Sequence, residues 1–213
     1  ATIEGIPLDL SRLSLKIRNR ILKGYEEAEK MLCHRLLCRN DRVLELGGGI
    51  GFIGLYCQKR LGITNYVTVE ANPFTISLLK ENYQLNGMTP NVLNYAISDR
   101  NGPALLNIGG DFWEHSVGTK PENENCLEVP GITFTDLLNS LPFHPNTLII
   151  DVEGAERFIN FREIPEDIRK IIIEIHPVIV GEASTEDLIR AVCDNGFRIV
   201  CKEGYTMALT KEF

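Results

Sequence analysis

Five short apolar runs recur along the middle of the chain, and each is followed by a polar or glycine-rich stretch. Runs of this length are typical of strands buried on both faces of a parallel sheet. Between the first three runs, apolar residues at helical spacing predict helices over 51–61 and 74–86. The alternation of strands and helices predicts a doubly wound α/β fold. The five predicted strands are 42–46, 66–70, 92–97, 148–152 and 171–175.

The C-terminal end of the chain departs from this alternation. Segments 197–201 and 205–210 are strand-like, and only three residues separate them. Because a parallel pair needs a crossover of a dozen or more residues, these two segments are expected to form an antiparallel hairpin. The predicted architecture is a Rossmann-like, doubly wound sheet of seven strands, mostly parallel, with a reversed C-terminal strand.

Helical spacing also precedes the first strand. It predicts one helix over 9–23, which Asp9 or Ser11 can cap and Gly24 can end, and a second helix over 25–38. Basic side chains lie along the first of these helices, and we interpret them as a solvated surface rather than as a binding surface. They are Arg12, Lys16, Arg18, Arg20 and Lys23.

A segment too long for a simple crossover separates the third and fourth predicted strands. Within it, 104–108 and 126–129 predict a β-ribbon, and 109–125 predicts a lid loop that contains His115. No repeat or linker divides the chain, so we expect a single domain over residues 1–213. Its expected parts are an N-terminal helical segment, 1–40, and a core, 41–213, with an insertion at about 103–131.

Charge and cysteine content limit the partners and the compartment. Lys and Arg number 22 against 29 Asp and Glu, and the net charge of −7 disfavours binding to nucleic acid or to an anionic membrane. No apolar run approaches the roughly 20 residues that span a bilayer, and no secretory signal is visible. The six cysteines form no C-x-x-C pair, and a chain this long can bury a core without disulfides. We therefore expect free thiols and a cytoplasmic location.

A glycine cluster at 47–51 lies between the first strand and the helix that follows it. Glycines at such a turn let a ligand approach the N–H groups of a helix N-terminus. Residues 49–54 match the G-x-G-x-x-G pattern of dinucleotide sites, and residues 45–51 match the E-x-G-x-G-x-G pattern of S-adenosylmethionine sites. Under the second pattern, the residues expected to contact the ligand are Glu45, Gly47, Gly49 and Gly51.

Carboxylates at the strand ends favour the second pattern. Glu45 is expected near the cationic amino-acid end of S-adenosylmethionine, whereas its charge is unfavourable beside a pyrophosphate. Glu70, followed by Ala71 at the end of the second strand, can accept hydrogen bonds from both hydroxyls of a ribose. Ser98 and Asp99 at the end of the third strand are expected near the adenine, with a turn-forming role as the alternative for Asp99.

The fourth and fifth strands end in groups that exchange protons. Asp151 and Glu153 follow the fourth strand and His176 follows the fifth, so the sheet is expected to bring all three together. Carboxylates gathered at a strand end are costly unless they are solvated, paired or functional. We expect Asp151 near the methionine end of the donor, and Glu153 or His176 as the proton acceptor, with His115 as a weaker candidate. Glu156 is interpreted as the start of a helix.

These segments resemble the FkbM-type methyltransferases, a class I family that uses S-adenosylmethionine. The resemblance runs over about 25–177, and Ile150-Asp151-Val152-Glu153-Gly154-Ala155-Glu156 is its most specific segment. The other segments that carry it are Tyr25-Glu26, the glycine motif, Ala96-Ile97-Ser98-Asp99 and Phe134-Thr135-Asp136-Leu137-Leu138. In the first motif the family usually has Asp-x-Gly-Ala-Asn, and this chain has Glu-Leu-Gly-Gly-Gly at 45–49. The resemblance implies S-adenosylmethionine as cofactor and O-methylation of a small molecule, such as a sugar or a polyketide-like natural product.

Two other functions stay open at this stage. The G-x-G-x-x-G pattern alone also suits a nicotinamide-dependent oxidoreductase. A non-catalytic cofactor-binding scaffold, with the basic N-terminal helix as its partner surface, is the third hypothesis. Asp151, Glu153 and Glu174 are able to hold a hard divalent cation, but the motif is explained without one and we expect no metal.

Overall fold

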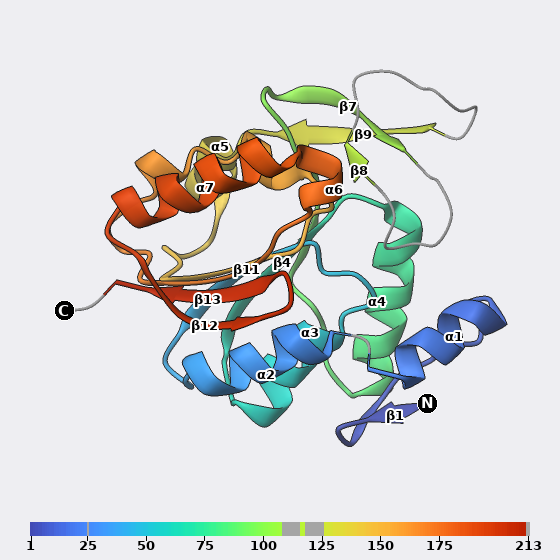
Figure 1. The fold of residues 1–213 in the computed structure, drawn as a ribbon. Helices are drawn as coiled ribbons and strands as arrows, with labels where there is room; N and C mark the ends of the chain where they lie inside the picture. Colours follow the sequence, from blue (N-terminus) through green and yellow to red (C-terminus); the bar gives the residue numbers. More distant parts are fainter. Residues whose placement is uncertain (25, 108–115, 118–125, 212–213) are drawn as a thin grey trace.

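A seven-stranded sheet forms the centre of the computed structural model, which describes residues 1–24, 26–107, 116–117 and 126–211 (Figure 1). The strand order is β12-β13-β11-β10-β3-β4-β5, and β13 is antiparallel to both of its neighbours. The other neighbouring pairs are parallel, which confirms the predicted mostly parallel sheet with a reversed C-terminal strand. The strands are β3 (Arg42–Leu46), β4 (Asn65–Glu70), β5 (Val92–Asn94), β10 (Thr147–Ile150), β11 (Lys170–Glu174), β12 (Arg198–Glu203) and β13 (Thr206–Thr210).

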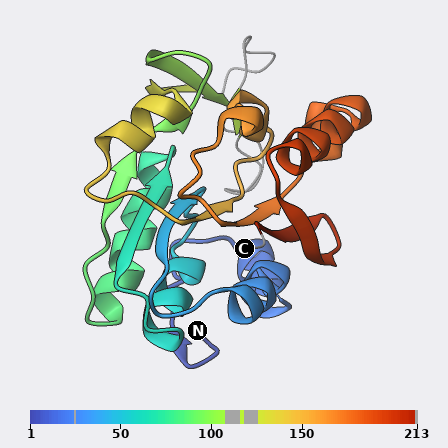
Figure 2. The ribbon, with the colours of Figure 1, turned by 90° about the vertical axis from the view of Figure 1, so that its left-hand side faces the viewer.

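Helices cover both faces of this sheet (Figure 2). On β3, Val43 points into one apolar core, while Leu44 and Leu46 point into the other, as the alternation of a strand between two buried faces requires. The Val43 side is covered by α2 (Glu27–Leu36), α3 (Phe52–Arg60) and α4 (Pro73–Leu85), and the Leu44 side by α5 (Phe134–Ser140) and α7 (Glu182–Asp194). The carboxyl ends of the parallel strands therefore open at one edge between two helical layers.

The predicted third strand is divided between two sheets. Residues 92–94 form β5 of the central sheet, and β6 (Ala96–Ile97) pairs instead with β9 (Cys126–Ile132) of a second sheet. The side-chain amide of Asn94 donates hydrogen bonds to the carbonyls of Glu70 and Ala71, and the chain leaves the central sheet just after it. The pattern of apolar residues runs on through both strands, which is why the sequence predicted one.

The predicted β-ribbon is confirmed by the second sheet, whose order is β6-β9-β7-β8. In it β7 (Gly102–Asn107) pairs antiparallel with β9 and with β8 (Ser116–Val117). Apart from 116–117, the predicted lid loop, including His115, lies outside the described residues.

The first predicted helix begins later than expected. It is α1 (Leu15–Leu22), and its cap is Ser14, whose hydroxyl accepts a hydrogen bond from the N–H of Ile17. Asp9 instead accepts from the N–H of Ser11 in a local turn. The N-terminus also contains a short hairpin that the sequence did not predict, formed by β1 (Thr2–Ile3) and β2 (Ile6–Pro7).

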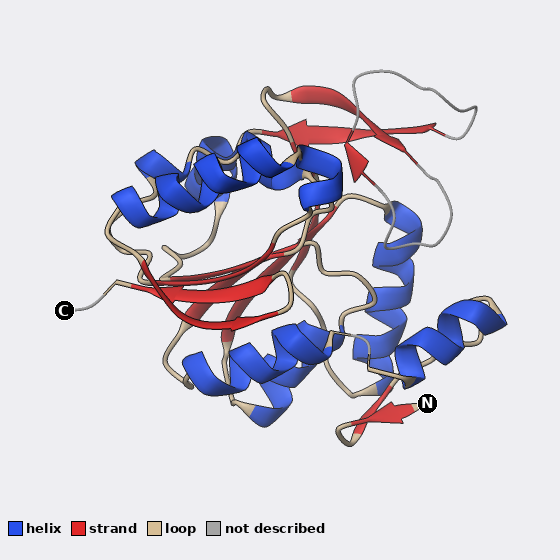
Figure 3. Cartoon of the chain, viewed as in Figure 1, coloured by secondary structure: helices blue, strands red, loops and turns tan. Residues whose placement is uncertain are grey.

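The crossover from β10 to β11, where the sequence placed the start of a helix at Glu156, is helical only in short turns. It contains two 3₁₀ turns, η1 (Ala155–Phe158) and η2 (Phe161–Glu163), and no α-helix (Figure 3). After β11 the chain forms the short helix α6 (Pro177–Val180) before α7. Two successive left-handed residues, Glu153 with φ 47° and Gly154 with φ 94°, turn the chain sharply after β10. This turn holds Asp151 and Glu153 at the strand end, and Glu156 follows in the first turn of η1.

The six cysteines are free thiols, as predicted. Cys33 and Cys57 are buried in the core on the α3 side. Among the described residues, no helix combines the length and the apolar character needed to cross a bilayer.

Candidate active site

The glycine loop joins the carboxyl ends of three strands. The N–H groups of Gly47 and Gly48 donate to the carbonyl of Val69 on β4, at 2.9 and 3.2 Å. Gly47 has a φ of 87°, and a Cβ at this position would overlap the carbonyl oxygen of Asp151, just after β10. A glycine is therefore required where the loop passes between β4 and β10.

Glu70 lies beside this loop, as the sequence predicted. Its Oε2 accepts a hydrogen bond from the N–H of Gly49 at 3.0 Å, and its Oε1 accepts from the N–H of Asn72 at 2.8 Å. Burial raises the pKa of Glu70 to about 7, against the opposing effect of these N–H donors. The carboxylate is fixed by the backbone, and its unused lone pairs are able to accept the two hydroxyls of a ribose. Ala71 follows it, half-buried against the second sheet.

Glu45 lies in the interior and not at the open edge. Its side chain is 2% exposed and accepts a hydrogen bond from the hydroxyl of Thr68 at 2.7 Å. Strand alternation directs it to the face that α3 covers, where burial raises its pKa to about 7. At this buried position Glu45 does not face the open edge of the sheet, so the structure does not support the expected contact between Glu45 and the amino-acid end of the donor.

Ser98 and Asp99 follow β6 of the second sheet, whereas Glu70 ends β4 of the central sheet. Ser98 is buried and Asp99 is exposed, and both line a cavity of about 240 Å³ beside α5. That cavity is lined neither by the glycine loop nor by Glu70. Contact of Ser98 or Asp99 with adenine stays a prediction, and this arrangement gives it no support.

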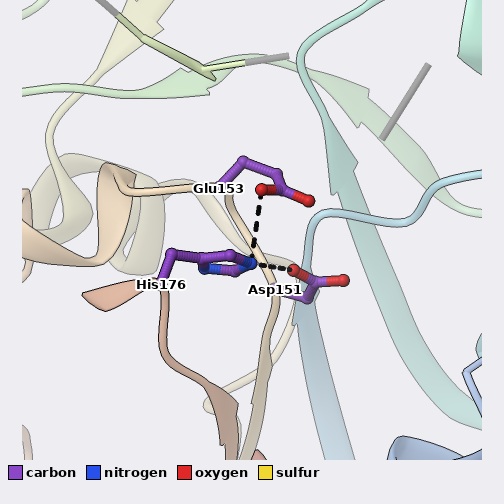
Figure 4. A group of neighbouring side chains, drawn as sticks. All are labelled: Asp151, Glu153 and His176. Carbon is purple, nitrogen blue, oxygen red and sulfur yellow. Dashed lines mark ion pairs between the residues drawn. The ribbon is translucent and has the colours of Figure 1, made fainter. Parts of the chain in front are cut away.

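Asp151, Glu153 and His176 do converge, as Figure 4 shows. The Nε2 atom of His176 lies 3.3 Å from Oε2 of Glu153 and 3.5 Å from Oδ1 of Asp151. Asp151 and Glu153 follow β10 and His176 follows β11, and these two strands are parallel neighbours. The side chains that end two adjacent strands therefore form one group, here named the Asp–Glu–His group.

Glu156 supports this group. It lies in the first turn of the 3₁₀ helix η1, so it does begin a helical turn as expected, but its contact with His176 was not predicted. The Glu156 side chain is fully buried. It accepts hydrogen bonds from the N–H of Gly154 at 2.8 Å and from the N–H of His176 at 3.1 Å. Nδ1 of His176 lies 3.3 Å from Oε1 of Glu156. The sequence carried one sign of this role, because three carboxylates follow β10 within six residues and His176 ends the next strand.

The carboxylates set the protonation of the imidazole. Burial lowers the pKa of His176, but its hydrogen bond with Glu156 and the charges of Asp151 and Glu153 outweigh burial and raise the pKa to about 9. An ordinary imidazole pKa lies near 6.5, so His176 carries a proton at neutral pH. Burial raises the pKa of the Asp151 carboxyl, and Glu174 raises it further, whereas His176 lowers it.

A cavity of about 450 Å³ opens beside the Asp–Glu–His group. Its walls come from α1, α2 and the turn between β12 and β13, and two basic side chains of the N-terminal helix, Arg20 and Lys23, line it. The sequence had assigned those two side chains to a solvated surface. The acidic lining residues are Glu26, Glu27, Glu29, Asp151, Glu153, Glu174 and Glu203.

Comparison with known families is made on this geometry. The chain matches the methyltransferase FkbM domain over residues 47–199, which is more than half of its length. The chain belongs to the FkbM methyltransferases. Membership confirms the predicted family, the methyltransferase class and S-adenosylmethionine as the cofactor. It also decides the interpretation of the glycine cluster against a nicotinamide cofactor.

Similar proteins place this FkbM methyltransferase among class I folds. A solved ribosomal protein L11 methylase from Lactobacillus delbrueckii subsp. bulgaricus is similar with a TM-score of 0.53 and 14% identity, covering 90% of this chain and 79% of that one. A magnesium protoporphyrin IX methyltransferase from Synechocystis PCC 6803, solved with bound SAM, gives 0.51 and 13%, covering 93% and 85%. Both likenesses concern the fold alone.

Two curated relatives are similar over part of this FkbM methyltransferase. A putative protein N5-glutamine methyltransferase of Methanocaldococcus jannaschii is 31% identical over 105 residues, which is 49% of each chain. A protein-lysine N-methyltransferase of Chaetomium thermophilum is 29% identical over 77 residues, which is 36% of this chain and 23% of that protein. The chain thus matches half or less of the length of these relatives, and its single-domain organisation stays a prediction.

Proposed function

We propose that this FkbM methyltransferase transfers the methyl group of S-adenosylmethionine to a hydroxyl of a small molecule, such as a sugar or a natural product. The observation that carries the proposal is the Asp–Glu–His group, which borders a cavity of about 450 Å³ at the carboxyl edge of the sheet. A hydroxyl is a weak nucleophile until its proton leaves. Methyl transfer to oxygen therefore needs a proton acceptor at the acceptor's position.

The donor fits the glycine-loop half of this edge. S-adenosylmethionine supplies a methyl carbon that its sulfonium makes electrophilic. Gly47 and Gly49 leave part of the loop backbone accessible, whereas Gly51 is buried against Leu79 and Tyr83. Glu70 is already oriented by the N–H of Gly49 for the ribose hydroxyls. Asp151, whose carbonyl adjoins Gly47, is assigned to the methionine end.

Glu153 is the first candidate for the proton acceptor. The pKa of about 9 keeps His176 protonated at neutral pH, so its imidazole has no free nitrogen for another proton. The Glu153 carboxylate lines the cavity, and Nε2 of His176 lies 3.3 Å from it. In this assignment His176 orients Glu153, and Glu156 in turn orients His176.

Methylation of a protein nitrogen is the second candidate. The two curated relatives carry names of protein N-methyltransferases, for glutamine and for lysine. The acidic lining of the cavity also suits a positively charged side chain such as lysine. In this case the Asp–Glu–His group would bind the cationic acceptor rather than deprotonate a hydroxyl.

Transfer of labelled methyl groups separates these functions. Purified enzyme with methyl-labelled S-adenosylmethionine would be offered hydroxylated small molecules in one panel and basic or glutamine-containing proteins in another. Label recovered as a methyl ether supports the proposal. Label found only on protein nitrogen overturns it in favour of the second candidate. Binding of S-adenosylhomocysteine without transfer to either panel supports the non-catalytic scaffold instead.

A further inference from the structure

We infer that Asp151, Glu153 and His176 form a binding site for one divalent transition-metal ion. One oxygen from each carboxylate and one imidazole nitrogen lie within 4.8 Å of one another. Carboxylate oxygen and imidazole nitrogen together suit Mn²⁺ and Zn²⁺ better than Mg²⁺, which prefers oxygen ligands. The inference rests on the proposed function only for what the ion does there, because binding is measurable without methyl transfer.

The distances between the three side chains favour a shared ion over direct hydrogen bonds. Nε2 of His176 lies 3.3 Å from Glu153 Oε2 and 3.5 Å from Asp151 Oδ1. Charge-assisted N–H···O bonds are usually about 2.7–2.9 Å long. Two ligand atoms that are each about 2.1 Å from one ion lie about 3.0 Å apart at a right angle and about 3.4 Å apart at the tetrahedral angle. The two separations from Nε2 lie near the tetrahedral value, and the two carboxylate oxygens lie within 4.8 Å of each other.

Asp151 makes an ion pair with His176 but lacks a hydrogen bond at the same oxygen. Its Oδ1 atom is buried and, among the described residues, has no hydrogen-bond partner. A buried carboxylate oxygen without a hydrogen bond is costly, and such atoms in folded proteins usually mark an ion or a ligand. Figure 4 shows this oxygen directed toward the imidazole nitrogen of His176.

Glu156 completes the arrangement that metal-binding histidines use. Its fully buried carboxylate lies 3.3 Å from Nδ1 of His176 and is itself fixed by two backbone N–H groups. A histidine that ligates a metal through one nitrogen commonly donates the other N–H to a carboxylate, which fixes the ring. With Nδ1 directed to Glu156, Nε2 of His176 is the nitrogen that faces Asp151 and Glu153. An ion bound there displaces the proton that Nε2 carries in the metal-free site.

The surroundings favour a cation and leave it accessible. Four carboxyl groups gather around the one imidazole: Asp151, Glu153, Glu156 and Glu174. A divalent ion compensates this excess of negative charge. Asp151 and Glu153 also line the 450 Å³ cavity, so the free coordination positions of the ion face the space assigned to the acceptor. An acceptor oxygen bound there would be held in place and made more acidic. Each carboxylate offers one oxygen to the ion, so the second oxygen of Glu153 remains to take the proton of the acceptor.

Mn²⁺ uptake by the metal-stripped protein tests the site. We expect one Mn²⁺ per chain by calorimetry, and loss of the free Mn²⁺ signal by electron paramagnetic resonance. Asp151→Asn and His176→Gln should each weaken Mn²⁺ binding tenfold or more, and Glu156→Gln by about 10–100-fold. The matched control is Glu203→Gln, which removes the same charge from the same cavity but lies outside the group, and should change affinity less than about threefold.

A second measurement does not depend on variants that fold. Bound Mn²⁺ should broaden the imidazole resonances of His176 before those of His34, which is hydrogen-bonded to Tyr56, and His144, which lines the other cavity. No uptake of Mn²⁺ or Zn²⁺, or equal weakening by Glu203→Gln and Asp151→Asn, would overturn the inference. If the metal inference fails in this way, methyl transfer that persists in a chelator would still support the proposed function. If Mn²⁺ binds but no methyl transfer is found, the proposed function is overturned and the metal site stands.

Discussion

The two halves of the sheet's carboxyl edge are built by different means. In the β3–β4 half the backbone makes the site, because N–H groups of the glycine loop bind Val69 and orient Glu70. In the β10–β11 half side chains make it, because His176 lies among carboxylates from the neighbouring strand. The first half suits a donor that many methyltransferases share, and the second half suits an acceptor that differs between them.

Glu45 and Glu70 show the same contrast at smaller scale. Both are glutamates on adjacent strands, and burial raises the pKa of each to about 7. Glu45 is buried under α3 with one hydroxyl partner, whereas Glu70 is held at the strand end by N–H donors. A carboxylate in the glycine motif is thus a packing element here, and the carboxylate at the end of the next strand is the one available to the donor.

The largest expected effect concerns the side-chain half. Glu153→Gln removes the proposed proton acceptor at nearly constant volume, so turnover should fall by about 10²–10⁴-fold. The affinity for S-adenosylhomocysteine should stay nearly constant, because the residues assigned to the donor, among them Glu70 and Asp151, do not include Glu153. Steady-state rates and calorimetry on the same preparations check both, with the exposed Glu182→Gln as a charge-matched control. Full turnover by the Glu153 variant removes Glu153 from the proton transfer.

The second prediction concerns the point where the two halves meet. Gly47→Ala places a Cβ against the carbonyl of Asp151 on a left-handed backbone, and should lower the free energy of unfolding by about 3–5 kcal/mol. Gly196→Ala is the matched control, since Gly196 has a φ of 89° but open space around it. It should cost only the backbone strain, about 1–2 kcal/mol. Equal losses in urea denaturation would show that the clash with Asp151 is unimportant.

The third prediction concerns how the buried Glu45 makes the stability of the protein depend on pH. Burial raises the pKa of Glu45 from 4.5 to about 7 in the folded chain. Between these values the unfolded chain loses its proton first, so stability from this group falls as pH rises from 4.5 to 7 and stays lost above 7. The cost is roughly 2–4 kcal/mol.

Glu45→Gln should abolish that part of the pH dependence. The variant should therefore gain stability relative to the wild type by this amount between pH 4 and pH 8. Urea denaturation across that range measures it, with Glu182→Gln as the exposed reference. A constant difference between wild type and the Glu45 variant at all pH values would contradict the burial argument.

Local sequence was sufficient for the strands and for the glycine loop. A run such as 171–175 has few alternatives to a buried strand, and three-residue separation forces the C-terminal hairpin. The convergence of Asp151 with His176 was also predictable, because both end strands of one parallel sheet. Those features depend only on local pattern and on the rule for parallel strand ends.

Other features depend on tertiary packing, which the pattern of apolar and polar residues along one sequence does not reveal. Glu45 points inward because of which face of β3 receives α3, and Glu156 is buried because the crossover forms 3₁₀ turns instead of a helix. Asp99 lies at a different cavity because the chain leaves the central sheet after Asn94. In each case the surroundings of the side chain depend on which elements pack against it, and the local pattern does not contain that information.

One measurement tests the division of labour most directly. S-adenosylhomocysteine would be titrated calorimetrically into the wild type, Glu70→Ala and Glu153→Gln. Loss of the Glu70 carboxylate should weaken binding by about 1–3 kcal/mol, which is roughly 5- to 150-fold, while Glu153→Gln should stay within about twofold of the wild type. Unchanged affinity in the Glu70 variant, or a larger loss in the Glu153 variant, would contradict a donor held by the backbone half and a proton moved by the side-chain half.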